Sequence, residues 1–100
     1  MCRLTQIKET GFLIASHIKP WRAATNKERL DGNNGLLLSP HVDRLFDRGF
    51  ISFKGNGELI VSDKLPDSVK KEWLISVGNY GRFNAKQQQY LQYHRLNILK

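Results

Sequence analysis

The sequence predicts an α+β fold: a strand, a loop, a second strand and a helix, followed by a β-hairpin and two C-terminal helices. Three observations predict it. Short apolar runs of strand length are separated by clusters of turn residues. One segment, residues 39–49, carries both the start and the stop signals of a helix. The 100 residues are 40% hydrophobic and 25% charged, which is typical of one small globular domain.

The first third of the chain supplies the two expected strands. The apolar stretch Phe12–Ala15 predicts a buried strand, which Pro20 ends because proline has no N–H donor for pairing. Residues 22–34 are rich in Asn, Asp and Gly and predict a loop with one helical turn at 27–30. Leu36–Leu38 form the second expected strand.

The segment SPHVDRLFDRG, residues 39–49, predicts the central helix. Ser39 suits the N-cap, Pro40 the first helical position and Gly49 the left-handed C-terminal cap. The apolar residues of this helix share one face, which we expect to pack on the two strands: Val42, Leu45 and Phe46.

The second half of the chain predicts elements that support the first. Residues 50–62 predict a hairpin whose turn is Gly-Asn-Gly at 55–57. Helices are expected over 67–77 and 85–97. We expect the aromatic residues of this half to cover the first half and complete the core: Trp73, Tyr80, Tyr90 and Tyr93.

Charge and cysteine content restrict the partners and the compartment. Sixteen Lys and Arg against nine Asp and Glu give a net charge of +7, which favours an anionic partner such as nucleic acid. The single cysteine, Cys2, excludes an internal disulfide and a multi-cysteine zinc site. We expect a cytoplasmic protein without a membrane partner, since no apolar run reaches the length of a membrane span.

The three histidines are candidates for chemistry because imidazole titrates near neutral pH. His17 directly follows the first apolar stretch and could accept a proton from water; the alternative is a strand-end histidine that hydrogen-bonds the loop. His94 shares a helical face with Tyr90 and Leu91, which favours a packed histidine over a ligand.

The central helix carries candidate metal ligands. Asp43 and Asp47 are spaced i, i+4 and project from one flank, where two carboxylates can hold one hard divalent cation. The alternative is a solvated acidic pair, or an ion pair of Asp47 with Arg44. His41 projects from a different flank, and near the helix N-terminus it is expected to be neutral and able to bind a metal.

Three blocks in this order, SHIKPW, NGLLLSPHVDRLFDRGFISF and YLQYHRLNIL, resemble the HNH nucleases, in the branch of restriction-type endonucleases. The resemblance extends over nearly the whole chain, from CRLT at residue 2. It implies a ββα-metal (His-Me) finger, in which two strands and a helix surround one divalent ion. It also implies that the expected hairpin and the two C-terminal helices support this finger.

The resemblance assigns roles residue by residue. His17 matches the general base that activates water, and Asn34 matches the middle residue that ties the loop to the strand and helps orient the base. The metal ligand nine residues beyond the asparagine falls on Asp43, and a second ligand one turn later falls on Asp47. The third letter of the motif taken literally is His41, so all three stay candidates and Asp43 is favoured.

Two departures from the family pattern matter. Many HNH enzymes carry an acidic residue or a histidine as a metal ligand just before the base, and Ser16 stands there in this chain. Cys2 and Thr5 resemble the start of the family's CxxT segment, so the usual upstream part is missing. We therefore expect residues 1–100 to be a single HNH nuclease domain, either compact and self-standing or the C-terminal part of a longer nuclease.

The resemblance implies a metal-dependent endonuclease that hydrolyses DNA phosphodiester bonds, of restriction or defence type, with one divalent ion (Mg, Mn, Ni or Zn). The alternative, which Ser16 motivates, is a catalytically weak DNA-binding module that retains the finger. Specificity is expected from an upstream domain or a partner protein. Basic residues near the motif are candidates for phosphate contacts, although each alone also fits a merely solubilising role: Lys19, Arg22, Arg44 and Arg48.

Overall fold

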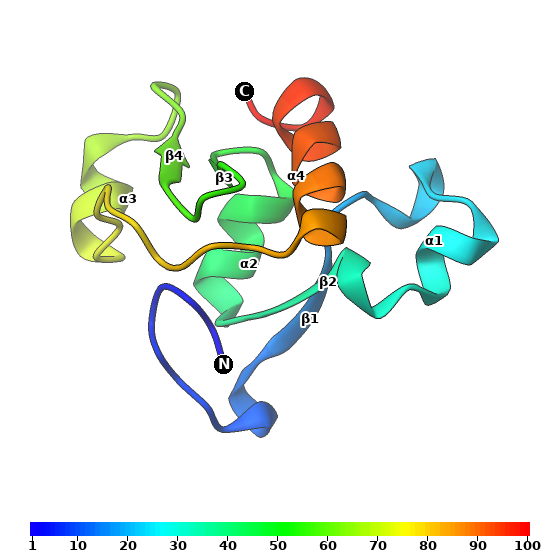
Figure 1. Ribbon diagram of the computed structural model, residues 1–100. Coiled ribbons are helices and arrows are strands. Elements are labelled where there is room, and N and C mark those ends of the chain that lie inside the picture. The colour runs from blue at the N-terminus through cyan, green and yellow to red at the C-terminus, as the bar shows by residue number, and fades with distance from the viewer.

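Two antiparallel hairpins and the helices packed on them make up the computed structural model, which describes residues 1–100 (Figure 1). The predicted α+β fold is confirmed. The strands are β1 (Ile14–His17), β2 (Gly35–Leu38), β3 (Ile51–Phe53) and β4 (Leu59–Val61). The α-helices are α1 (Asn26–Leu30), α2 (Pro40–Asp47), α3 (Asp67–Glu72) and α4 (Ala85–Asn97).

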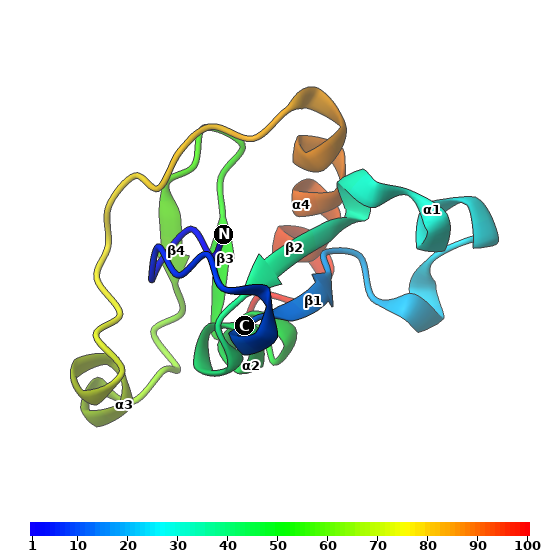
Figure 2. The ribbon, with the colours of Figure 1, turned by 90° about the horizontal axis from the view of Figure 1, so that it is seen from below.

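The first hairpin and α2 form a ββα unit. β1 and β2 pair antiparallel with Ile14 opposite Leu38 and His17 opposite Gly35. Because α2 begins directly after β2, it turns back along the hairpin and runs in the same sense as β1 (Figures 1 and 2). The later turns of α2 therefore approach the end of β1 that carries His17.

The two ends of α2 are held by different contacts. Ser39 is the N-cap residue, but its hydroxyl is bonded to the Thr5 hydroxyl at 2.6 Å rather than to a helix N–H. Gly49 adopts a φ of +79°, as the left-handed cap requires, and a side chain there would collide with the Ile98 carbonyl. Gly49 thus allows the C-terminus of the chain to pack against the end of α2.

The predicted apolar face of α2 is confirmed. Val42, Leu45 and Phe46 are buried, and the helix contacts both β1 and β3. The second hairpin follows the prediction as well, with β3 and β4 joined by the Gly-Asn-Gly turn. Helix α4 covers the interior side of β3 and spans the residues predicted for it.

The prediction of a buried strand at Phe12–Ala15 is wrong in position and in burial. β1 begins at Ile14, and Phe12 lies in a short 3-10 turn with 71% of its surface exposed. Within β1 only Ser16 is buried. The hairpin has just two strands and α2 covers one face, so an apolar residue in it does not have to be interior.

The helix predicted over 67–77 is shorter than expected. α3 ends at Glu72, and two residues later Leu74 adopts a left-handed φ of +54° and is 85% exposed. This backbone conformation is incompatible with continuing the helix. Ile75, beyond the reversal, returns to the core.

His94 is a packed residue of the core, as predicted. Its Nε2 donates to the Phe46 carbonyl at 2.8 Å, which leaves Nδ1 to accept from the Ser52 hydroxyl at 2.8 Å. The ring stacks on Phe46 with centroids 3.8 Å apart. One side chain of α4 thereby joins β3 to the last turn of α2.

None of the helices combines the length and the apolar character that crossing a membrane requires.

Candidate functional site

His17 closes β1 and stands half-buried where the chain turns into the long loop. Its ring meets the edge of Trp21 with centroids 5.5 Å apart and an interplanar angle of 74°. Trp21 is itself 56% exposed and held by Arg29, whose guanidinium lies 4.5 Å from the indole and whose Nε donates to the Trp21 carbonyl at 2.8 Å. No protein group hydrogen-bonds the imidazole of His17, so both ring nitrogens are available to water or a substrate.

Asn34 fixes the backbone that follows His17. The asparagine is fully buried, and its Oδ1 accepts from the Lys19 N–H at 2.7 Å. Its Nδ2 donates to the carbonyls of Lys19 and Glu28, each at 3.3 Å. Asn34 thus joins the turn after β1, the helix α1 and the start of β2. It does not contact the imidazole itself.

Asp43 and Asp47 lie on one flank of α2, one half-buried and one exposed. Neither carboxylate takes part in a hydrogen bond or an ion pair, so the oxygens of both are free. No group of three or more His, Cys, Asp and Glu side chains comes together in the structure. Two free carboxylates fit a hard cation such as Mg²⁺, which commonly keeps several waters and takes further oxygens from a phosphate.

Ser16 occupies the face of β1 that α2 covers. Successive side chains of a strand point to opposite faces, so Ser16, with 6% of its surface exposed, and His17 point to different sides of the hairpin. The residue before the histidine therefore faces the helix that carries the two aspartates. In this chain it can offer only a hydroxyl.

The structure does not bring His41 together with Asp43 and Asp47. The His41 ring packs edge-on against Trp73 with centroids 5.8 Å apart, on the side of α2 that faces α3. Partial burial lowers the pKa of His41. Arg44 and Arg48 lie on this α3 side too, where they line a hollow of about 280 Å³.

Comparison with known protein families identifies the ββα unit and the segments beside it. Residues 2–54 fit the family described as HNH endonuclease. The chain belongs to the HNH endonuclease family. The matched residues run from the N-terminal loop through the ββα unit to the end of β3, and include His17 and Asn34. No curated protein matches the chain.

Membership in the HNH endonuclease family carries nuclease activity on nucleic acid as its general function. HNH endonucleases act on DNA and generally use a divalent metal. The ββα unit of this HNH domain combines an unpaired imidazole, a buried asparagine beside it and two unpaired carboxylates. The first two residues come from the hairpin, and the carboxylates come from α2.

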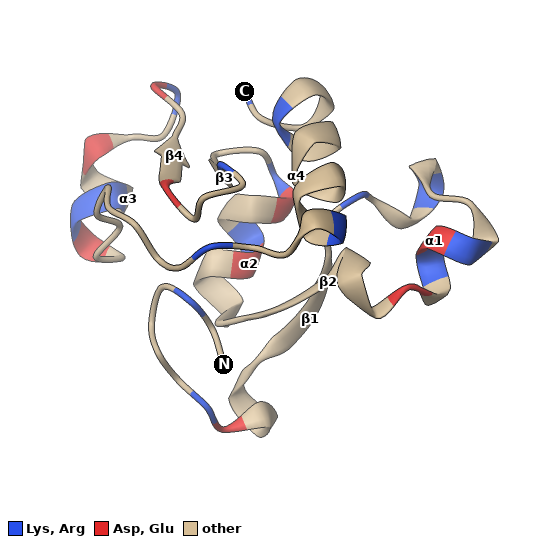
Figure 3. Ribbon diagram, in the orientation of Figure 1, with Lys and Arg blue, Asp and Glu red and all other residues tan.

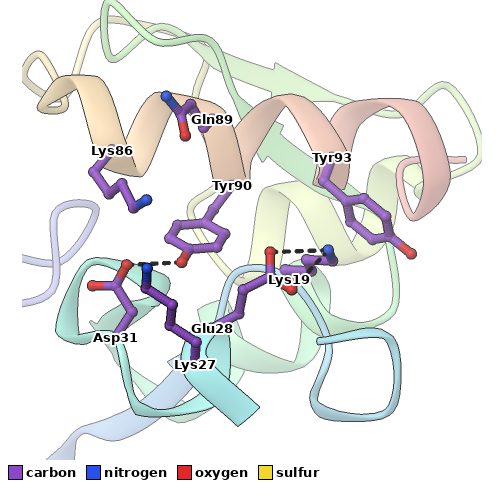
Figure 4. Close-up of a pocket in the computed structure, with 8 residues that line it drawn as sticks. All are labelled: Lys19, Lys27, Glu28, Asp31, Lys86, Gln89, Tyr90 and Tyr93. Carbon is purple, nitrogen blue, oxygen red and sulfur yellow. Dashed lines mark hydrogen bonds and ion pairs between the residues drawn. The ribbon is translucent and has the colours of Figure 1, made fainter. Parts of the chain in front are cut away.

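Beside His17 the HNH domain is hollowed between α1 and α4 (Figure 4). Lys19, two residues after the histidine, lies in this groove; its Nζ is 3.0 Å from both carboxylate oxygens of Glu28 and 4.9 Å from the centre of the Tyr93 ring. Arg22 is exposed in the turn beside Trp21. The lysines Lys27 and Lys86 also line the groove, and no sequence motif points to either of them.

Proposed function

We propose that residues 1–100 form the HNH nuclease domain of a metal-dependent DNA endonuclease of restriction or defence type. Two observations support it best: the unpaired imidazole of His17 at the end of β1, and the two unpaired carboxylates on one flank of α2, the helix that contacts β1. Family membership supplies the general activity. The assignment of individual residues and of the metal is our proposal.

His17 acts as the general base. A neutral imidazole nitrogen takes the proton of a water as the water oxygen attacks phosphorus and the ester bond to the leaving oxygen breaks. Trp21 limits the tilt of the ring, and Asn34 holds the backbone that follows it. Because these contacts restrict the imidazole, the general base keeps nearly the same orientation from one turnover to the next.

Asp43 and Asp47 would hold the divalent ion, as oxygen ligands on one flank of α2. When bound, the ion supplies positive charge for the phosphate oxygens, whose negative charge grows during the reaction. His41 is the less suitable ligand because its ring packs on Trp73 toward α3. A phosphate contact by Arg22 would lie on the His17 side, and contacts by Arg44 and Arg48 on the α3 side. Lys19 lies on the His17 side too, but its ammonium is bound to Glu28, which makes it the less suitable phosphate contact.

A second function is favoured by one observation, the serine at position 16. A hydroxyl is a weak ligand in the place where many HNH enzymes carry a carboxylate or an imidazole. If the two aspartates do not compensate, the chain is a DNA-binding module that retains the HNH finger. The +7 net charge fits both functions.

The deciding experiment incubates the purified chain with supercoiled plasmid in Mg²⁺, Mn²⁺, Ni²⁺, Zn²⁺ or EDTA. We expect nicking that EDTA abolishes and that His17→Ala lowers by about a hundredfold or more. Asp43→Asn and Asp47→Asn are expected to lower it as well, whereas Asp63→Asn, at an exposed and unpaired carboxylate, is the matched control. Nicking that survives in His17→Ala would refute the base assignment. DNA binding without nicking in every metal would establish the binding module.

Metal binding can be measured without any turnover. Mg²⁺ or Mn²⁺ should raise the melting temperature of the wild-type chain, because a ligand that binds only the folded state stabilises it. The Asp43→Asn/Asp47→Asn double variant should lose this increase, and Asp63→Asn should keep it. An equal increase in all three proteins would place the ion elsewhere.

A further inference from the structure

We propose that the groove between α1 and α4 binds a phosphodiester of the DNA backbone next to the cleavage site, through the ammonium groups of Lys27 and Lys86. The inference rests on the proposed function and names a substrate contact for it. Neither lysine belongs to the HNH motif blocks, and they come from opposite walls of the groove: Lys27 from α1 and Lys86 from the first turn of α4.

The groove has the size and lining of a site for a polar ligand. Its volume is about 320 Å³. Figure 4 shows the side chains of Lys27 and Lys86 directed toward the same region beside the Tyr90 hydroxyl. Neither ammonium takes part in an ion pair or hydrogen bond with the protein. The Lys86 Nζ lies 6.0 Å from the centre of the Tyr90 ring, and this contact leaves its N–H groups available to an anion.

The carboxylates of the groove are already engaged, which argues against a cation as the occupant. Glu28 receives two bonds from Lys19 and one from the Thr25 N–H. Asp31 receives bonds from the N–H and the side-chain amide of Asn33 and from the Tyr90 hydroxyl. All four carboxylate oxygens have donors.

The Tyr90 hydroxyl is a stable part of this arrangement. It donates to Asp31 at 2.8 Å, and burial together with this bond raises the pKa of Tyr90 to about 12. The phenol therefore stays protonated at neutral pH, and Asp31 stays bound to it. Within the groove the negative charge of Asp31 offsets the positive charge of one of the two ammonium groups, those of Lys27 and Lys86.

The charge balance selects a phosphodiester. Lys19 and Glu28 neutralise each other, and Lys27 and Lys86 against Asp31 leave one positive charge. A backbone phosphodiester carries one negative charge, so it neutralises the groove without surplus. Gln89 and Tyr93 on α4 complete the lining and offer an amide and a ring to the sugar beside the phosphate.

The position of the groove links it to the candidate active site. Lys19 lines the groove and is two residues from His17, and Asn34 fixes the Lys19 backbone from both its N–H and its carbonyl. A DNA strand with one phosphate in the groove is therefore close to the imidazole. The contact would position the duplex without reading its sequence.

The test measures DNA binding in EDTA, where no cleavage occurs, by fluorescence anisotropy of a labelled duplex over a series of salt concentrations. The Lys27→Ala/Lys86→Ala variant is compared with Lys8→Ala/Lys64→Ala, which removes the same charge from two exposed lysines in the N-terminal loop and in the turn before α3. These segments do not border the groove (Figure 3). Circular dichroism and melting curves verify that both variants are folded.

We expect the groove variant to bind about tenfold more weakly and to lower the slope of log K against log salt by about 1, as for the loss of one phosphate contact. The control should change affinity by less than about twofold. Equal binding by the two variants would overturn the groove proposal. Inorganic phosphate at millimolar concentration should compete only weakly; if it displaces the duplex fully, the site takes free phosphate and the proposal of a backbone contact fails.

The same samples separate this proposal from the proposed function. If the wild-type chain nicks plasmid and the groove variant is equal to its control in binding and nicking, only the groove proposal falls. If the wild-type chain neither binds nor nicks DNA, the proposed function falls and the groove proposal falls with it.

Discussion

The side-chain amide of Asn34 is bonded to both backbone groups of Lys19: Oδ1 accepts from the N–H at 2.7 Å, and Nδ2 donates to the carbonyl at 3.3 Å. Lys19 lies beyond the end of β1, so no neighbouring strand pairs with its backbone. The buried Asn34 side chain makes the hydrogen bonds that a neighbouring strand would otherwise make. The geometry explains how a histidine can stand at the start of a turn and still keep a fixed position. Pro20, which cannot donate a hydrogen bond, follows immediately.

Asn34→Ala should lower the free energy of unfolding by about 2–3 kcal/mol, because it leaves the partly buried N–H and carbonyl of Lys19 without partners and removes one of the two donors to the Glu28 carbonyl. Urea unfolding measures this change. Asn97→Ala is the control, since that amide is exposed and bonds only the Tyr93 carbonyl, and it should change stability by less than about 0.5 kcal/mol. Equal losses in the two variants would show that the Asn34 amide is not a structural link.

Trp21 is a positioning residue for His17 in the proposed reaction. Trp21→Ala should lower the nicking rate about tenfold at saturating DNA, because the imidazole loses the indole edge that limits its tilt. Trp21→Phe should restore most of the rate, since a phenyl ring can provide a similar edge. The Kd for duplex in EDTA separates this role from DNA binding: a loss of affinity that accounts for the whole effect would contradict positioning.

The stability of the fold should fall as the pH drops below about 6.5. Burial lowers the pKa of His94 from its ordinary value of 6.5, against opposing effects of the Phe46 carbonyl and Asp47. Below 6.5 the unfolded chain takes up a proton that the folded chain resists, so unfolding becomes more favourable until the pH reaches the folded pKa. Above 6.5 both states are neutral and this contribution to stability is complete. The lowered pKa of His41, caused by burial, acts in the same direction.

Urea midpoints measured between pH 8 and pH 5 test this dependence. His94→Gln is expected to be less stable at every pH but to show a shallower decline over this interval, since the amide does not titrate. A decline as steep as in the wild-type chain would assign the effect to other groups.

Gly49→Ala should destabilise the chain by about 1–3 kcal/mol, because position 49 has a φ of +79° and a Cβ would meet the Ile98 carbonyl. Gly11→Ala is the matched control: no heavy atom lies within 4 Å of the added Cβ and its φ is not positive, so stability should change by less than about 0.5 kcal/mol. Thermal unfolding measures both variants. A tolerated Gly49→Ala would mean that the C-terminus is not packed on α2 in solution.

Local signals in the sequence determined much of this fold. Ser39-Pro40 and Gly49 mark the limits of α2, and the Gly-Asn-Gly turn sets the second hairpin, because these residues restrict the backbone within one or two positions. The periodicity of Val42, Leu45 and Phe46 also predicted correctly which face of α2 is buried. The order of the motif blocks was sufficient to indicate the HNH family, which the match over residues 2–54 shows.

Tertiary structure alone decided which apolar residues are exposed, where α3 ends and which distant side chains are in contact. The exposure of Phe12 depends on how many layers cover the hairpin, and apolar character does not reveal that. The length of α3 depends on the chain reversal at Leu74, which brings Ile75 back to the core. The helical period already separates His41 from the aspartates, but only the tertiary packing places its ring against Trp73.

The groove beside His17 also separates what local sequence signals determine from what tertiary structure decides. Lys27 and Lys86 face each other only because α4 packs beside the loop between the strands of the first hairpin, with Tyr90 bonded to Asp31. Local preferences act over a few residues, so they specify helices, turns and motif spacing. Which distant side chains share one surface is decided by the packing of the whole core.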